Sequence, residues 1–93
     1  MSVKSYQDRV RALGCVVCAE TELVTYPKDD VQLHHVESIR DGLSDYAIVP
    51  LCEWHHTGGG GVHGLGRRGF VARYKLTDVD LLALVAKGLS NES

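Results

Sequence analysis

The sequence predicts a small α+β fold in which two short strands are flanked by helices. The chain has 93 residues, which is the size of one small domain. Two short segments rich in β-branched residues lie between stretches whose apolar residues follow a helical period. All five histidines and one of the three cysteines fall between Leu33 and Gly64, around those two segments. We therefore expect this stretch to be the functional centre of the molecule.

The composition is that of a globular chain with little material for a core. Hydrophobic residues make up 44% of the chain, but it has only one Phe and one Trp. A domain of this size often needs disulfides or metal to hold it together. Three cysteines cannot all pair within the chain, and the polar residues after Met1 do not form a signal peptide. No apolar run is long enough to span a membrane, so we expect a cytoplasmic protein held together by metal.

The first 30 residues are expected to hold one short helix and a knuckle. Ser5 can cap a helix that runs to about Leu13, and Gly14 would end it. Residues 15–18 would follow as a tight knuckle. Residues 19–30 contain several turn-forming side chains and would be a loop.

The central part of the chain is expected to hold two strands and a short helix. Residues 31–36 and 46–51 have strand character and would be joined as an irregular hairpin. A helix would begin near Cys52 and end at the four glycines of residues 58–61, because glycine has little helix propensity.

The C-terminal part is expected to be helical. Residues 70–74 would form one segment, and Thr77 would cap a last helix that ends at Gly88. A broad apolar face of this last helix would pack on the core, and it consists of Leu81, Leu82, Leu84 and Val85.

The spacing of the cysteines is typical of a structural zinc site. Cys15 and Cys18 form a CxxC pair, and Cys52 and His55 form a CxxH pair. Together they supply the four soft ligands that tetrahedral zinc uses. Alternatively, Cys15 and Cys18 are small core residues or a redox pair, but no thioredoxin-like strand–helix pattern surrounds them.

Four histidines remain once the zinc ligands are assigned. Neighbouring residues on a strand point to opposite faces, so His34 and His35 are expected to have different roles. One would bind a metal, and the other would be a free imidazole whose ordinary pKa suits a general base. His56 and His63 could complete a three-histidine metal site with an open position. The alternative is that these histidines are merely exposed or packed.

Several motifs resemble one nuclease superfamily. The chain contains GCVVC, LHHVE, SDYAIVPLCEWHH, GVHG and a late DLLAL in that order. This series resembles the HNH (ββα-metal) endonucleases, and most closely their phage recombination-enhancement (Ref) branch. The resemblance implies a ββα-metal fold with an N-terminal helix and zinc knuckle and a C-terminal helix. It implies one nuclease domain, 1–93, composed of that N-terminal part (1–30), a ββα-metal core (31–64) and C-terminal helices (65–93).

The resemblance also implies a role for each candidate ligand. His34 takes the place of a catalytic-metal ligand on the first strand, and His35 takes the place of the general base. His56 and His63 take the helix-side ligand places for the same divalent metal, which would be magnesium, manganese or zinc. The ligands of the structural zinc would be Cys15, Cys18, Cys52 and His55.

The chain departs from the ordinary HNH pattern at two places. The middle Asn, which orients the base, would fall at or near Ala47, whose side chain cannot orient anything. Asp45 is the candidate to replace it, and the backbone of the second strand is the alternative. The usual three-residue gap between the helix-side ligands is lengthened to six by TGGGGV, as in the Ref branch.

A nuclease needs contacts to phosphate, and the charge of this chain is distributed accordingly. The formal net charge of −2 does not favour a polyanion, but no acidic residue interrupts the cations between residues 66 and 76. A metal and a general base are the groups that phosphodiester hydrolysis requires. The candidate phosphate-binding residues are Arg67, Arg68, Arg40 and Lys75. The alternative for each is a solvated surface charge.

The sequence therefore predicts a metal-dependent DNA endonuclease of low sequence specificity. By resemblance it is phage-encoded and related to recombination, so it would act in the host cytoplasm, with DNA and a host recombinase filament as partners and no membrane. Two other interpretations are a non-catalytic zinc adaptor that binds nucleic acid or protein, and a hydrolase of small phosphoesters. A zinc adaptor gives no reason for four further histidines. A hydrolase of small phosphoesters is disfavoured because the sequence has no apolar segment that would form a deep pocket.

Overall fold

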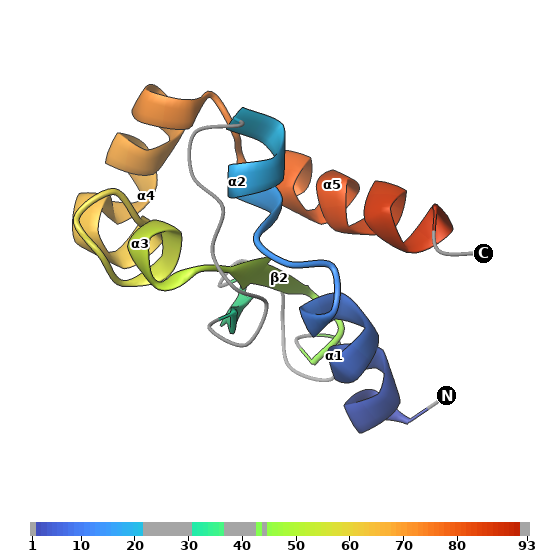
Figure 1. Ribbon diagram of the computed structural model, residues 1–93. Coiled ribbons are helices and arrows are strands. Elements are labelled where there is room, and N and C mark those ends of the chain that lie inside the picture. Colours follow the sequence, from blue (N-terminus) through green and yellow to red (C-terminus); the bar gives the residue numbers. More distant parts are fainter. Residues whose placement is uncertain (1, 22–30, 37–42, 44, 92–93) are drawn as a thin grey trace.

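The computed structural model of the chain describes residues 2–21, 31–36, 43 and 45–91 (Figure 1). The described residues form five helices and one antiparallel pair of strands, which confirms the predicted α+β class. In chain order these are α1 (Val3–Arg11), α2 (Val16–Thr21), β1 (Gln32–His35), β2 (Ile48–Leu51), α3 (Glu53–His56), α4 (Val62–Tyr74) and α5 (Asp78–Ser90). None of the described helices is both long and apolar enough to cross a membrane.

The two strands pair so that His34 and His35 separate. His34 lies opposite Val49 and His35 opposite Ile48, and the backbone N–H of Val36 continues the ladder by donating to Ala47 at 2.9 Å. Because side chains alternate along a strand, His34 is buried at 5% exposure while His35 is exposed. The predicted divergence of the two histidines is therefore confirmed.

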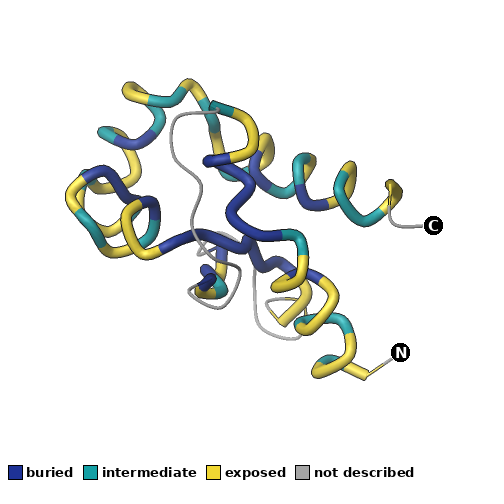
Figure 2. The backbone as a smooth tube through the Cα atoms, viewed as in Figure 1, coloured by how far each residue is buried: buried dark blue, intermediate teal, exposed yellow. Residues whose placement is uncertain are grey.

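Strand β2 is the centre of the core. All four of its residues are buried, and α1, α2 and α5 contact it (Figure 2). The fully buried side chains around it include Val10 from α1, Val17 from α2 and Leu81 from α5. Burying an aliphatic side chain of this kind stabilises the fold by about 1.5–3 kcal/mol. The end of β2 leads directly into α3, so the position of the histidines on α3 depends on this packing (Figure 1).

Two predictions for the N-terminal part are wrong. The cap of α1 is Ser2, whose Oγ accepts a hydrogen bond from the N–H of Ser5 at 3.1 Å, so Ser5 lies inside the helix. The predicted loop begins too early, since α2 continues through residues 19–21 and the Oγ1 of Thr21 donates to the carbonyl of Val17. The rest of that segment, residues 22–30, lies outside the described residues, as does most of the turn between the strands.

The C-terminal helix also continues further than predicted. Thr77 caps it as expected, in a capping box with Asp80, but the helix runs past Gly88 to Ser90. A Cβ on Gly88 would lie 3.1 Å from the side chain of Leu13. Gly88 therefore serves close packing of α5 against Leu13, which lies just after α1, instead of helix termination.

The ends of α3 agree with the prediction from the sequence. Cys52 is the N-cap of α3, and the glycines after it end that helix. The predicted segment 70–74 is the last part of α4, which begins earlier and is kinked at Gly66.

Candidate metal sites and active site

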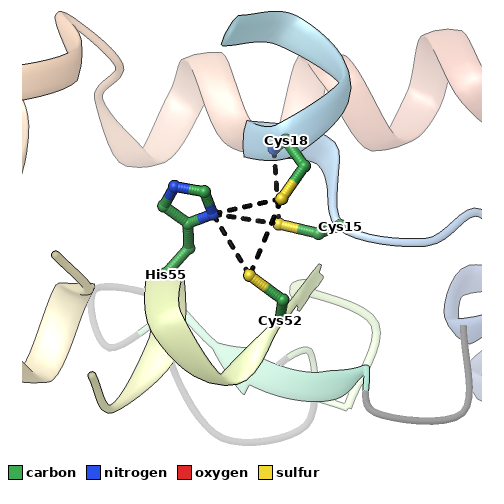
Figure 3. A group of neighbouring side chains, drawn as sticks. All are labelled: Cys15, Cys18, Cys52 and His55. Atoms are coloured by element: carbon green, nitrogen blue, oxygen red, sulfur yellow. Dashed lines mark hydrogen bonds between the residues drawn. The ribbon is translucent and has the colours of Figure 1, made fainter. Parts of the chain in front are cut away.

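Three cysteines and one histidine converge between α2 and α3 (Figure 3). The Nδ1 atom of His55 lies 3.5, 3.4 and 3.2 Å from the Sγ atoms of Cys15, Cys18 and Cys52. The Sγ atoms of Cys18 and Cys52 are 3.7 Å apart. All four residues are buried, so the two half-sites predicted from the sequence meet in the interior. We call this group the Cys3His cluster.

The spacing of the Cys3His cluster fits a tetrahedral zinc ion. With Zn–S bonds of about 2.3 Å and a Zn–N bond of about 2.0–2.1 Å, tetrahedral geometry separates sulfur from nitrogen by about 3.5 Å and two sulfurs by about 3.8 Å. The separations in the cluster are close to these values. The buried cluster could therefore hold a structural metal such as zinc.

The electrostatics of the Cys3His cluster also fit a cation. Burial opposes ionisation of Cys15, but hydrogen bonds involving His55 and the backbone of Cys52 and Cys18 lower the pKa of its thiol to about 6. Burial, followed by repulsion from Cys15, raises the pKa of Cys18, and burial is the largest cause of the raised pKa of Cys52. The raised pKa values keep Cys18 and Cys52 as neutral thiols unless a positive charge lies nearby, and a divalent metal would supply the charge that lets all three thiols ionise.

A second group, the three-histidine cluster, lies nearer the surface. It combines His34 from β1, His56 from α3 and His63 from the start of α4. The ring centroids of His34 lie 5.5 Å from His56 and 5.4 Å from His63, and those of His56 and His63 are 4.8 Å apart. One nitrogen of each ring lies within 4.8 Å of the others. His34 is buried, His56 is half-buried and His63 is exposed, so the cluster is open on one side.

The surroundings of His56 favour a neutral ring. Burial, together with repulsion from His34 and His63, lowers its pKa. A neutral imidazole keeps a lone pair for a metal, and three histidines with an open position are one of the ligand sets known for zinc. The Nδ1 atom of His56 lies 2.6 Å from the Oε1 atom of Gln32 on β1.

The glycine-rich segment between His56 and His63 permits the close return of the chain. A Cβ on Gly64 would overlap the carbonyl oxygen of Gly58, so a larger residue cannot occupy this position without moving backbone. The unusual six-residue gap thus forms a compact turn that brings His63 back to the cluster.

Tyr74 connects the two clusters. Its ring packs edge-on against His55 of the Cys3His cluster, with centroids 5.3 Å apart. Its hydroxyl donates to the carbonyl of Gly60 at 2.7 Å, within the turn that carries His63. One side chain therefore contacts a candidate zinc ligand and the turn beside the three-histidine cluster.

A cavity of about 170 Å³ adjoins the three-histidine cluster. Its walls are formed by His34, Val62, His63, Gly66, Arg67 and Asp78. Gly66 has a left-handed backbone, with φ 75° and ψ 165°, which breaks α4 between His63 and Arg67. The Nη2 atom of Arg67 lies 3.0 Å from the Oδ2 atom of Asp78, and the Asp78 side chain is only 18% exposed. A cation is therefore fixed in the wall of a cavity that two candidate metal ligands also line.

The remaining predicted site residues lie outside this cavity or outside the described residues. His35 and Asp45 are exposed, and within the described part of the chain neither has a hydrogen-bond partner. Arg68 and Lys75 are exposed on and just after α4, and Lys75 is its left-handed C-cap. Arg40 lies outside the described residues.

Three residues of the site had not been identified from the sequence. Gln32, Tyr74 and Asp78 contact the clusters or the cavity through tertiary structure. The period of a strand offered one signal, because Gln32 shares a strand face with His34. For the other two residues the sequence offered none.

The fold and the sites define a class of protein. Two paired strands, the helix that follows them and a Cys3His cluster at a possible zinc site fit a small ββα-metal-like domain. The chain matches, over residues 2–89, the family model described as "Recombination enhancement, RecA-dependent nuclease", and it belongs to this family. The predicted Ref branch is thereby supported, and the family description indicates a nuclease that functions in recombination. The chain has no match among the curated proteins with which it was compared.

Proposed function

We propose that this protein is an HNH-type endonuclease that hydrolyses DNA phosphodiester bonds in a metal-dependent reaction with low sequence specificity. The observation that carries the proposal is the convergence of three imidazoles beside a cavity whose wall also holds Arg67. A nuclease must stabilise the negative charge of the phosphate and activate a water molecule. A metal held by the three histidines, together with Arg67, would stabilise that charge.

His34, His56 and His63 would hold the catalytic divalent metal: magnesium, manganese or zinc. Nitrogen ligands fit zinc more closely than magnesium or manganese, which prefer oxygen. A bound metal would supply Lewis-acid stabilisation of the charge that develops on the phosphate. Because the three side chains come from three different elements, the fold must be intact for them to meet.

His35 would act as the general base. It directly follows His34 and is exposed, so a water molecule can reach its ring. His35 would take a proton from the attacking water, whose oxygen bonds to phosphorus while the bond to the leaving oxygen breaks. Asp45 would orient that ring. It lies in the turn before β2, two residues from Ala47, whose carbonyl accepts from the residue after His35.

Arg67 would contact the phosphate at the reacting centre, and the other cations would contact the flanking backbone. Arg67 is 65% exposed, lines the cavity and is held by Asp78, which leaves guanidinium N–H groups for a phosphate. Arg68 and Lys75 are exposed and lie close to Arg67 in the sequence. Arg40, which lies outside the described residues, is a further candidate for contact with the flanking backbone. None of these contacts reads a base, which is the reason for the low specificity.

DNA and a RecA filament are the proposed partners. The family description names RecA dependence and recombination enhancement, which supports both. With the phage origin that the Ref resemblance implies, the nuclease would act in the host cytoplasm, where RecA and DNA are found.

Nicking of supercoiled plasmid tests the proposal, with each divalent metal and with or without RecA filaments. Wild type should cut. His34→Ala should lose catalytic metal along with activity, because a three-ligand site deprived of one ligand holds metal poorly. His35→Ala should keep its metal and its DNA binding but nick about 10²–10⁴-fold more slowly. Metal content by elemental analysis, measured on the same samples, separates the two histidines.

Two results would contradict this proposal. If His35→Ala cuts as fast as wild type, His35 is not the base. If wild type fails to cut with every metal, in the presence of RecA filaments as well as without them, the non-catalytic zinc adaptor becomes the better interpretation.

A further inference from the structure

We infer that Gln32 is a positioning residue for the three-histidine cluster, because it fixes the tautomer and the ring orientation of His56. This inference rests on the proposed function, in which His56 binds the catalytic metal. It concerns a residue that belongs to neither cluster and lies on a different element from His56.

The contact between the two side chains is short and directional. The Oε1 atom of Gln32 lies 2.6 Å from the Nδ1 atom of His56, across 24 positions of sequence. An amide oxygen only accepts hydrogen bonds, so in this arrangement Nδ1 carries the hydrogen and donates it. The neutral ring then has no hydrogen on Nε2, and that nitrogen keeps its lone pair.

The free Nε2 atom is the one that a metal would use. The ring of His56 packs against those of His34 and His63, so the rings meet while Nδ1 is engaged by Gln32. Histidines that bind metals usually donate their second ring N–H to an oxygen, and this contact sets the tautomer and the ring angle. Gln32 supplies such an oxygen to Nδ1 of His56.

The position of Gln32 on β1 explains why it can do this. Gln32 and His34 are two residues apart, so their side chains leave the same face of the strand. One strand face therefore provides both a ligand and the group that orients a second ligand on α3. His56 is only half-buried, so packing alone restricts its ring less than it restricts the fully buried His55.

Two substitutions of Gln32 separate positioning from general stability. Gln32→Leu keeps a side chain of similar size but removes the acceptor, whereas Gln32→Glu retains an oxygen that can only accept. Gln7→Leu, on α1 and outside both clusters, is the matched control for replacing an amide with an apolar group. The measurements are calorimetric titration of the zinc-loaded protein with Co²⁺, the ¹⁵N chemical shifts of the His56 ring in metal-free three-histidine sites, and thermal unfolding.

We expect Gln32→Leu to weaken Co²⁺ binding by about 10–100-fold and to give His56 a mixture of tautomers. Gln32→Glu should bind Co²⁺ within a few-fold of wild type and keep Nδ1 protonated. The thermal midpoints of Gln32→Leu and Gln7→Leu should be similar. A purely structural hydrogen bond would instead change the midpoint of Gln32→Leu and leave both the tautomer and Co²⁺ binding unchanged.

The outcomes distinguish this inference from the proposed function. If wild type binds Co²⁺ and Gln32→Leu binds it equally well, the inference is wrong and the proposed metal site stands. If wild type carries the ring hydrogen on Nε2 and only Gln32→Glu moves it to Nδ1, the amide of Gln32 donates instead of accepting, and the inference is likewise overturned. If zinc-loaded wild type binds no second metal ion, the proposed site itself fails.

Discussion

His55 and His56 are neighbours on one short helix, yet they belong to two different sites. His55 is 1% exposed and directs Nδ1 at three thiols, whereas His56 is half-buried and directs Nδ1 at Gln32. Successive residues on a helix point about 100° apart, so α3 can present one histidine to the interior and the next towards the surface. One four-residue element thereby contributes to both clusters.

The difference in burial implies a difference in role. The Cys3His cluster joins α2 to α3 inside the core, so metal bound there would stabilise the fold. The three-histidine cluster is open and adjoins a cavity, so metal bound there could meet a substrate.

Removing metal from the Cys3His cluster should unfold the protein. Structural zinc contributes about 10–16 kcal/mol in zinc-finger peptides, which is comparable to the whole stability of a small domain, about 5–15 kcal/mol. Circular dichroism with a strong chelator, and of Cys18→Ala, measures the effect. His63→Ala is the matched variant in the other cluster, and its melt should stay cooperative. An unchanged melt after zinc is removed would contradict the structural role of the Cys3His cluster.

Removing cations beside the open cluster should weaken DNA binding while leaving the fold intact. For Arg67→Ala with Arg68→Ala, the slope of log affinity against log salt on duplex DNA should fall by roughly 0.9 for each lost phosphate contact. Lys87→Ala, on the exposed side of α5, is the control with one surface cation removed. Fluorescence anisotropy at several salt concentrations gives the slopes. The same affinity and slope in the double variant would place the DNA-binding surface elsewhere.

Tyr74→Phe should loosen the open cluster without emptying the buried one. The substitution keeps the ring against His55 but removes the hydrogen bond to the carbonyl of Gly60. Such a bond contributes about 1 kcal/mol, so Co²⁺ binding by the three-histidine cluster should weaken by up to about fivefold. Zinc content, measured by elemental analysis, should stay at one equivalent. Loss of zinc in Tyr74→Phe would contradict this prediction, because it would show that the hydrogen bond to Gly60 also supports the Cys3His cluster.

The sequence carried more information about the ligands than about the residues around them. Cys52 and His55 are one helical turn apart, and the alternation of a strand separates His34 from His35, so local geometry alone made these predictions possible. Gln32, Tyr74 and Asp78 act across the fold, and such contacts become visible only when the elements are packed. The role of Gly88 was missed for the same reason, because its small size matters only against Leu13.

The smallest expected effect concerns α5, which links the core to the cavity through Leu81 and Asp78. The Thr77 hydroxyl accepts from the N–H of Asp80, and Thr77→Ala should cost about 1 kcal/mol, or about 4–8 °C in Tm. Thr77→Ser keeps the hydroxyl and is the control. Both variants should retain the zinc of the Cys3His cluster.

The pH dependence of the same capping box separates it from the Cys3His cluster. Hydrogen bonds from the backbone and side chain of Thr77 lower the pKa of Asp80, so its contribution to stability is complete above the ordinary pKa of 3.8 and is lost as pH falls through the lowered value. The Tm difference between wild type and Thr77→Ala should therefore stay constant from about pH 5 to pH 8. Over the same range the Tm of both proteins should fall on acidification, because protons compete with zinc for the thiolates. A Tm difference that changes across this range would show that the capping box is coupled to the metal cluster.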